Sequence, residues 1–217
     1  MNEAPDDREN EAVDESSFDT DEEDHREEVR GGGTSFIGDL LRFSLLSIII
    51  VVPIRLFIAS PFVVNGSSMD PTFHTGEYLI VDQLSYQFSE PERGDVVIFH
   101  FPQNPSQFFI KRVIGLPGET VVLEGNKVKI INTEHPNGFY LDQSFLTHKS
   151  PKEEEEIFKL REDEYVVLGD NRTASSDSRV WGTVDERLIV GRALLRLFPL
   201  STVGYMPGDI DLQDQQQ

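Results

Sequence analysis

Two residues in this sequence, a serine and a lysine, have the surroundings expected of a hydrolytic pair. Ser68 lies in the run NGSSMDPTF at residues 65–73, directly after a long apolar segment. Lys111 interrupts the apolar run FIKRVIG at residues 109–115. A serine hydroxyl needs a neighbouring base to attack a carbonyl, and a lysine can be that base only when it is neutral. We therefore interpret Ser68 as a candidate nucleophile and Lys111 as its candidate base.

The position of Lys111 in an extended run favours a neutral amine. Alternate residues of a strand share a face, so Lys111 is expected beside Phe109 and Val113. Arg112 then lies on the opposite face, where it can pair elsewhere. Burial without a carboxylate lowers a lysine pKa, because desolvation penalises the charged form. The alternative is an edge-strand lysine whose ammonium reaches water.

A serine–histidine–aspartate triad is the other arrangement that would activate a serine. One of the five histidines lies in the N-terminal tail, and none of the other four has an acidic neighbour at a spacing that indicates an orienting partner. Triads assemble from distant positions, so the sequence leaves this alternative open. His100 is its best candidate member.

A polar segment at residues 169–179 has the opposite character to the run around Lys111. Its two acidic and two basic side chains can form charge-assisted pairs that hold a loop rigid, and its serines can orient a neutral lysine amine. The alternative is a solvated hairpin loop. The charged residues are Asp170, Arg172, Asp177 and Arg179, and the serines are Ser175, Ser176 and Ser178.

The charge of this 217-residue chain is concentrated at its N-terminus. The net charge is −20, and residues 1–34 carry −11 of it through 14 acidic residues and three arginines. The same residues include few apolar side chains, so they are predicted to form a disordered acidic tail. This tail is interpreted either as a solvated spacer or as a docking site for a basic partner. No basic surface indicates nucleic-acid binding. The absence of cysteine excludes disulfides, thiol nucleophiles and thiolate metal ligands.

The apolar segment that follows predicts one transmembrane helix at residues 36–59. The window 40–58 has the roughly 20 mostly apolar residues that a bilayer core requires. One alternative is a buried helix of a soluble protein. A cleaved signal peptide is another, which fits poorly because the A-x-A pattern is missing and a long charged tail precedes the apolar run. Arg26, Arg30 and Arg42 lie on the amino side of the span, and Arg55 is the only base at its other end before Arg93. The positive-inside rule therefore predicts a cytoplasmic tail and an extracytoplasmic body.

The body is expected to be mainly β, with coiled antiparallel or barrel-like sheets. Short β-rich runs alternate with Gly- and Pro-containing turns over residues 60–200, close behind the anchor and therefore near the bilayer. Residues 152–156 are expected to form an exposed acidic loop, and residues 201–217 a C-terminal tail. The predicted strands are Phe62–Asn65, Tyr78–Asp82, Asp95–Phe101, Phe108–Ile114, Thr120–Glu124, Lys127–Ile131, Tyr165–Leu168 and Leu188–Leu197.

Taken together, these motifs resemble the type I signal peptidase family over residues 40–198. The runs at residues 93–97 and 115–119 match as well. The resemblance implies a membrane-bound serine endopeptidase with a Ser/Lys dyad, in which Ser68 attacks, Lys111 is the base and Ser175 orients the lysine. It further implies structural ion pairs near the site. The supporting residues are Asp170, Asp177, Arg179, Arg112 and Ser67.

The resemblance also implies the substrates and shows two departures. Family members cut secretory signal peptides from preproteins after a small-residue A-x-A-like site, at the bilayer, and the secretion machinery is a further expected partner. No cofactor is expected. Gly66 stands where some members carry a serine that helps to hold the oxyanion, which leaves the Ser68 amide and Ser67. Thr173 and Ala174 replace a frequent Asp-Asn pair. A specialised Ser/Lys maturation protease and an inactive membrane-anchored binding protein are the alternatives.

Overall fold

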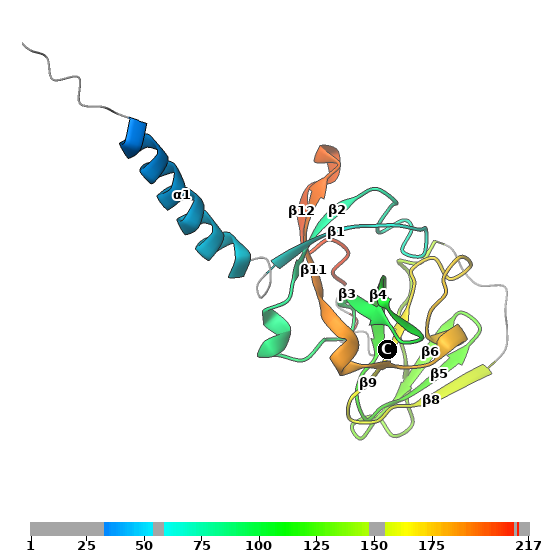
Figure 1. Ribbon diagram of the computed structural model, residues 1–217. Coiled ribbons are helices and arrows are strands. Elements are labelled where there is room, and N and C mark those ends of the chain that lie inside the picture. The colour runs from blue at the N-terminus through cyan, green and yellow to red at the C-terminus, as the bar shows by residue number, and fades with distance from the viewer. Residues whose placement is uncertain (1–32, 54–58, 148–154, 211, 213–217) are drawn as a thin grey trace, which may run out of the picture. The chain divides into compact units, whose positions relative to one another are not determined.

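The structure is a computed structural model that describes residues 33–53, 59–147, 155–210 and 212 (Figure 1). These residues form one long helix, a short second helix, three 3-10 turns and twelve strands. The elements are α1 (Gly33–Pro53), β1 (Ala59–Val63), β2 (Tyr78–Asp82), η2 (Ser85–Gln87), β3 (Val96–Phe101), β4 (Asn104–Gly115), β5 (Thr120–Glu124), β6 (Lys127–Ile131), β7 (Phe139–Tyr140), β8 (Glu155–Lys159), β9 (Glu164–Leu168), α2 (Ser178–Trp181), β10 (Val184–Asp185), η3 (Glu186–Leu188), β11 (Ile189–Phe198), η4 (Leu200–Thr202) and β12 (Gly204–Tyr205).

Helix α1 is long and apolar enough to cross a membrane. Its stretch Phe36–Pro53 carries few charges, and its side chains are exposed, as suits a helix whose solvent is lipid. The helix begins at Gly33, so the last two residues of the predicted 1–34 tail belong to it. The predicted span runs to Ala59, but Ala59 is the first residue of β1. The rest of the predicted tail lies outside the described residues.

The body is built from two antiparallel sheets, which confirms the mainly β prediction. The larger sheet has the order β1-β2-β11-β3-β4-β9-β10, with β12 paired to β11. The smaller sheet has the order β7-β6-β5-β8 and is inserted between β4 and β9 (Figure 1). Buried charges join the two: Arg93, before β3, pairs with Glu119, before β5, at 2.7 Å. The motifs at residues 93–97 and 115–119 thus meet in one contact.

Residues 201–210 and 212 belong to the fold, contrary to the predicted tail at 201–217, and the other residues of that tail lie outside the described part of the chain. Residues 204–205 form β12, and Leu212 is 1% exposed in the core beside the smaller sheet. The acidic run was also placed wrongly in part, because Glu155 and Glu156 open strand β8. Its exposed and half-buried residues alternate, so the acids are compatible with an outer edge strand.

Candidate active site

Ser68 lies on the loop that joins β1 to β2. Just after it the chain curls: the Asp70 amide donates to Ser67 O at 3.2 Å, and the Phe73 amide donates to Met69 O at 2.9 Å. The Met69 and Phe73 side chains are 1% and 0% exposed in the core beneath the loop. Two buried side chains therefore fix the backbone that presents Ser68.

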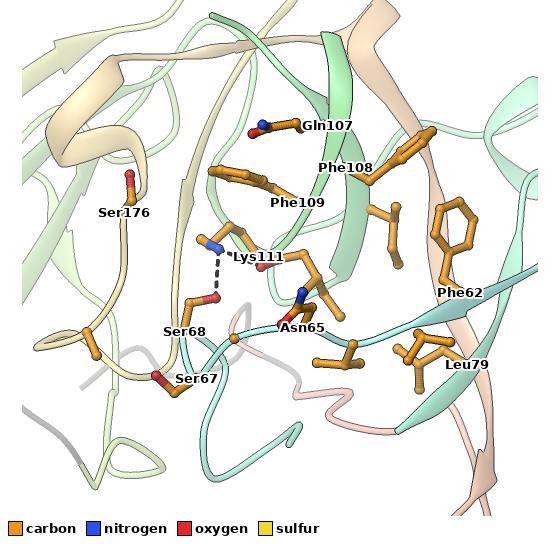
Figure 2. Close-up of a pocket in the computed structure, with 16 residues that line it drawn as sticks. Phe62, Asn65, Ser67, Ser68, Leu79, Gln107, Phe108, Phe109, Lys111 and Ser176 are labelled. Atoms are coloured by element: carbon orange, nitrogen blue, oxygen red, sulfur yellow. Dashed lines mark hydrogen bonds between the residues drawn. The ribbon is translucent and has the colours of Figure 1, made fainter. Parts of the chain in front are cut away.

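Strand β4 brings Lys111 to this loop, and its Nζ lies 2.8 Å from Ser68 Oγ (Figure 2). The amine also donates to Ile110 O at 2.8 Å and lies 5.1 Å from the centre of the Phe109 ring. Lys111 is 3% exposed, and no described carboxylate forms an ion pair with it. The buried lysine is confirmed, and the edge-strand alternative is wrong.

The surroundings of Lys111 weaken its hold on a proton. Burial lowers its pKa to about 8, while the more distant charges of Asp177 and Asp170 act in the opposite direction. Desolvation wins because a buried ammonium loses its hydration without gaining a direct anionic partner. A pKa near 8 leaves a useful fraction of the amine neutral close to physiological pH.

Asp170 ties the serine loop to the lysine strand. Its carboxylate accepts two hydrogen bonds from Arg112, at 2.9 and 2.6 Å, and a third from the Thr72 hydroxyl at 2.6 Å. Arg112 follows the candidate base, and Thr72 lies four residues after the candidate nucleophile. Asp170 and Arg112 are almost fully buried, so their bidentate pair is well shielded from water.

A second charged pair shapes the loop after β9. Asp177 accepts from the Gly169 amide at 3.0 Å and from two nitrogens of Arg179 at 2.8 Å. Burial alone would raise the pKa of Asp177, but hydrogen bonds and charge from Arg179 hold it below its usual value. Arg172 differs from the prediction, because it donates to Gly169 O at 3.0 Å and is absent from the ion pairs of the described residues.

Ser175 packs against Gly169, at the start of its own loop, and no hydrogen bond joins it to Lys111 among the described residues. A Cβ added to Gly169 would collide with Ser175 Oγ and with Ser68 O, so the glycine lets these segments meet. Ser175 Oγ is buried and makes no hydrogen bond of good geometry within the described chain. It is still close enough to the Asp177 carboxylate to help lower the pKa of Asp177. Its lysine-orienting role stays a prediction.

The described histidines do not form a triad with Ser68. His100 Nδ1 lies 2.6 Å from Pro105 O, and its ring packs on Phe108. His74 does have acidic neighbours, contrary to the expectation: its ring nitrogens lie 3.3 Å from Asp70 and 4.0 Å from Glu77. The partner of the Ser68 hydroxyl is instead Lys111.

A pocket of about 610 Å³ opens beside the pair, between the β1 end and the first half of β4. Strand β9 pairs with β4 only from Arg112 onward, so no strand of the described residues pairs with the β4 edge that faces the pocket. Most lining side chains are apolar and several come from β1 and β4 (Figure 2). They include Phe62, Val63, Val64, Leu79, Ile98, Phe108, Phe109 and Ile110.

The family can now be decided by comparison. A protein-family model described as "Signal peptidase, peptidase S26" matches residues 37–198. The chain belongs to this family. The signal peptidase family match thus includes α1 from residue 37, strands β1 to β11 and the Ser68–Lys111 pair.

Curated relatives agree with the signal peptidase assignment. Signal peptidase I of Leptolyngbya laminosa is 40% identical over 166 residues, which are 73% of this chain and 78% of the relative. Signal peptidase IB of Staphylococcus aureus is 33% identical over 171 residues, 74% and 88% of the two chains. The crystal structure of a signal peptidase I from Enterococcus faecalis is 31% identical, with a TM-score of 0.40, covering 48% of this chain and 97% of that one.

Two polar contributions to the site escaped the sequence reasoning. Thr72 is absent from the predicted site residues, whereas its hydroxyl donates to the Asp170 carboxylate at 2.6 Å. Asn65 was interpreted as part of a strand, but β1 ends at Val63 and Asn65 lines the pocket. The Asn-Gly pair at 65–66 is a turn signal and could have shown that the strand ends early.

Proposed function

We propose that this chain is a membrane-anchored serine endopeptidase that removes N-terminal signal peptides from exported preproteins. Ser68 is the nucleophile and Lys111 the general base. The observation that carries the proposal is the 2.8 Å contact between Lys111 Nζ and Ser68 Oγ, made by a buried amine whose pKa is lowered to about 8. Family membership supports the same reaction.

The proposed reaction divides into acylation and deacylation. The neutral Lys111 amine takes the Ser68 hydroxyl proton as Oγ attacks the scissile carbonyl and forms a tetrahedral intermediate. The resulting ammonium gives this proton to the departing nitrogen, which becomes the N-terminus of the mature protein. Lys111 then takes a proton from water as the water oxygen attacks the Ser68 ester. It gives this proton to Ser68 Oγ as the ester bond breaks, which releases the signal peptide as a carboxylic acid and restores the enzyme.

The preprotein would bind as an extended strand in the pocket beside Ser68. The end of β1 and the unpaired edge of β4 offer backbone groups for strand addition, and pocket side chains select what projects from the substrate. The substrate residues third and first before the cleaved bond are called −3 and −1. Small residues at these two positions suit a pocket walled by large apolar side chains. In this binding mode the signal-peptide residues before the cleaved bond occupy the pocket on one side of Ser68. The mature portion of the preprotein lies on the other side of Ser68.

Helix α1 would hold the enzyme in the membrane that its substrates cross. The arginines before the span indicate a cytoplasmic N-terminus and an extracytoplasmic body. In that orientation the lipid bilayer is a binding partner, and the secretion machinery that delivers preproteins is a second proposed partner. A protease-protection assay on sealed vesicles tests the orientation.

The substrate class is tested by changing the residue before the cut. A preprotein with Ala at −3 and −1 is expected to yield the mature N-terminus, as read by mass spectrometry. The same preprotein with Leu at −1 is expected to react at least about 100-fold more slowly, because near-attack geometry is sensitive to shifts of about 1 Å. Equal cleavage of both would contradict signal-peptide specificity and favour the specialised maturation protease.

The rate is expected to rise with pH as Lys111 loses its proton. The Lys111 pKa is about 8, so the inactive ammonium dominates at lower pH. The value of kcat/KM should therefore increase about 50-fold between pH 6 and pH 8 and then level off. The measurement is kcat/KM for one preprotein from pH 6 to pH 10. A midpoint near 6.5 would instead indicate a histidine base.

A further inference from the structure

The oxyanion of the proposed reaction needs hydrogen-bond donors near Ser68. As Oγ attacks, negative charge develops on the carbonyl oxygen, and preorganised N–H or O–H groups stabilise it. The Ser68 amide is one available donor, since it has no acceptor within the described part of the chain. A single donor leaves one side of the oxyanion without support, so the neighbouring residues decide how the hole is completed.

Gly66 cannot supply the second donor. It has no side chain, and its amide already donates to Thr75 Oγ1 at 3.1 Å, while the same hydroxyl donates to Gly66 O at 3.0 Å. Its φ of +101° suits glycine. Ser67 is no better placed, because its side chain points away from the Ser68–Lys111 pair (Figure 2).

Asn65 is the remaining polar side chain in the run of residues 65–68 that ends at Ser68. It lines the pocket together with Ser68 and Lys111, and Figure 2 shows it rising from the loop into the pocket beside that pair. Its amide has no hydrogen-bond partner among the described residues, although it can donate two hydrogen bonds. An unused donor on the wall of a largely apolar pocket is available to a substrate carbonyl.

The backbone on both sides of Asn65 is held in place. The Val64 amide donates to Glu77 O at 2.9 Å, and Val64 O accepts from the Gly76 amide at 2.9 Å. On the other side, the Thr75 hydroxyl accepts a hydrogen bond from the Gly66 amide and donates one to the Gly66 carbonyl. The Asn65 backbone therefore lies between two fixed points, which restricts the positions that its exposed side chain can reach around the pocket.

We propose that the Asn65 side-chain amide completes the oxyanion hole of this enzyme together with the Ser68 backbone amide. Thr75 acts as a positioning residue that holds the Gly66 turn. The inference rests on the proposed function, since it assigns a donor to the acyl transfer at Ser68. It places the donor on a side chain three residues before the nucleophile.

Cleavage of a preprotein by the purified full chain in detergent tests the donor. Asn65→Ala is expected to lower kcat by about 100-fold with KM changed less than about threefold, because the donor acts on the transition state. Asn65→Asp, which keeps the shape but has no N–H to donate, should be at least as slow. Asn137→Ala removes an exposed asparagine from a turn of the smaller sheet and should behave as wild type.

A peptide aldehyde that ends at the cleavage site provides a second readout. It forms a tetrahedral adduct with Ser68, so Asn65→Ala should weaken its inhibition by about the same factor as kcat falls, and leave the matching peptide amide unaffected. If kcat is unchanged, or only KM changes, Asn65 is a pocket wall and the inference is wrong. If wild type does not cleave the preprotein, the proposed function fails and this inference fails with it.

Discussion

Replacing Lys111 by arginine is expected to lower kcat for preprotein cleavage by about 10⁴-fold, although the positive charge is retained. A guanidinium does not lose its proton in the accessible pH range, so it cannot accept the Ser68 proton. Lys111→Met, which keeps much of the length and apolar volume, should be equally inactive. Lys111→Met should fold, because it removes a desolvated amine that has no ion pair to lose.

The control for these variants is a lysine with an ordinary exposed environment. Lys127 lies exposed at the start of β6, and Lys127→Arg should cleave at the wild-type rate. Initial rates under substrate saturation, measured for all variants at pH 8, give the comparison. Retention of more than about a tenth of the activity in Lys111→Arg would exclude a neutral lysine as the general base.

Replacing Asp170 by alanine is expected to destabilise the body by about 3–5 kcal/mol. The change leaves the Arg112 guanidinium, which is 0% exposed, without its anionic partner. It also removes the acceptor of the Thr72 hydroxyl, so the serine loop loses its link to β4. Activity should fall with stability, because Ser68 and Lys111 then depend on separate, looser segments.

Urea unfolding of the full chain, followed by tryptophan fluorescence, measures this change. Trp181 is the only tryptophan of the chain and lies in α2, four residues after Asp177. Asp163→Ala is the matched control: its pair with Arg161 has both side chains at least half exposed, and such pairs contribute about 0–1 kcal/mol. A decrease in the free energy of unfolding below about 1 kcal/mol for Asp170→Ala would contradict the proposed role of Asp170 in joining Arg112 and Thr72.

The strands with the clearest alternation and turn signals were predictable from sequence alone. Thr120–Glu124 and Lys127–Ile131 match β5 and β6, because the Gly125-Asn126 turn between them is a local signal. The C-terminal segment was missed because its sequence is polar and lacks a period. It is held by tertiary contacts, such as that of Gly208 O with Arg112 at 2.6 Å, which no local pattern encodes.

The site shows the same division between local and distant information. The contact between Ser68 and Lys111 was predictable only from the motifs taken together, because a serine in a polar turn and a lysine in a strand are each ordinary by themselves. The role of Asp170 in joining Thr72 to Arg112 depends on three distant segments. The pocket face of Asn65 also required the structure, since it depends on where β1 ends and how Thr75 holds Gly66.

Cleavage of a preprotein by the Ser68→Ala variant tests the central claim most directly. The measurement compares purified wild-type and variant chains in detergent at pH 8, with the mature N-terminus identified by mass spectrometry. The account predicts cleavage after the small residue at −1 by wild type, and a rate at least about 10³-fold lower for Ser68→Ala, which keeps the fold but lacks the nucleophile. Equal cleavage by both chains would contradict it.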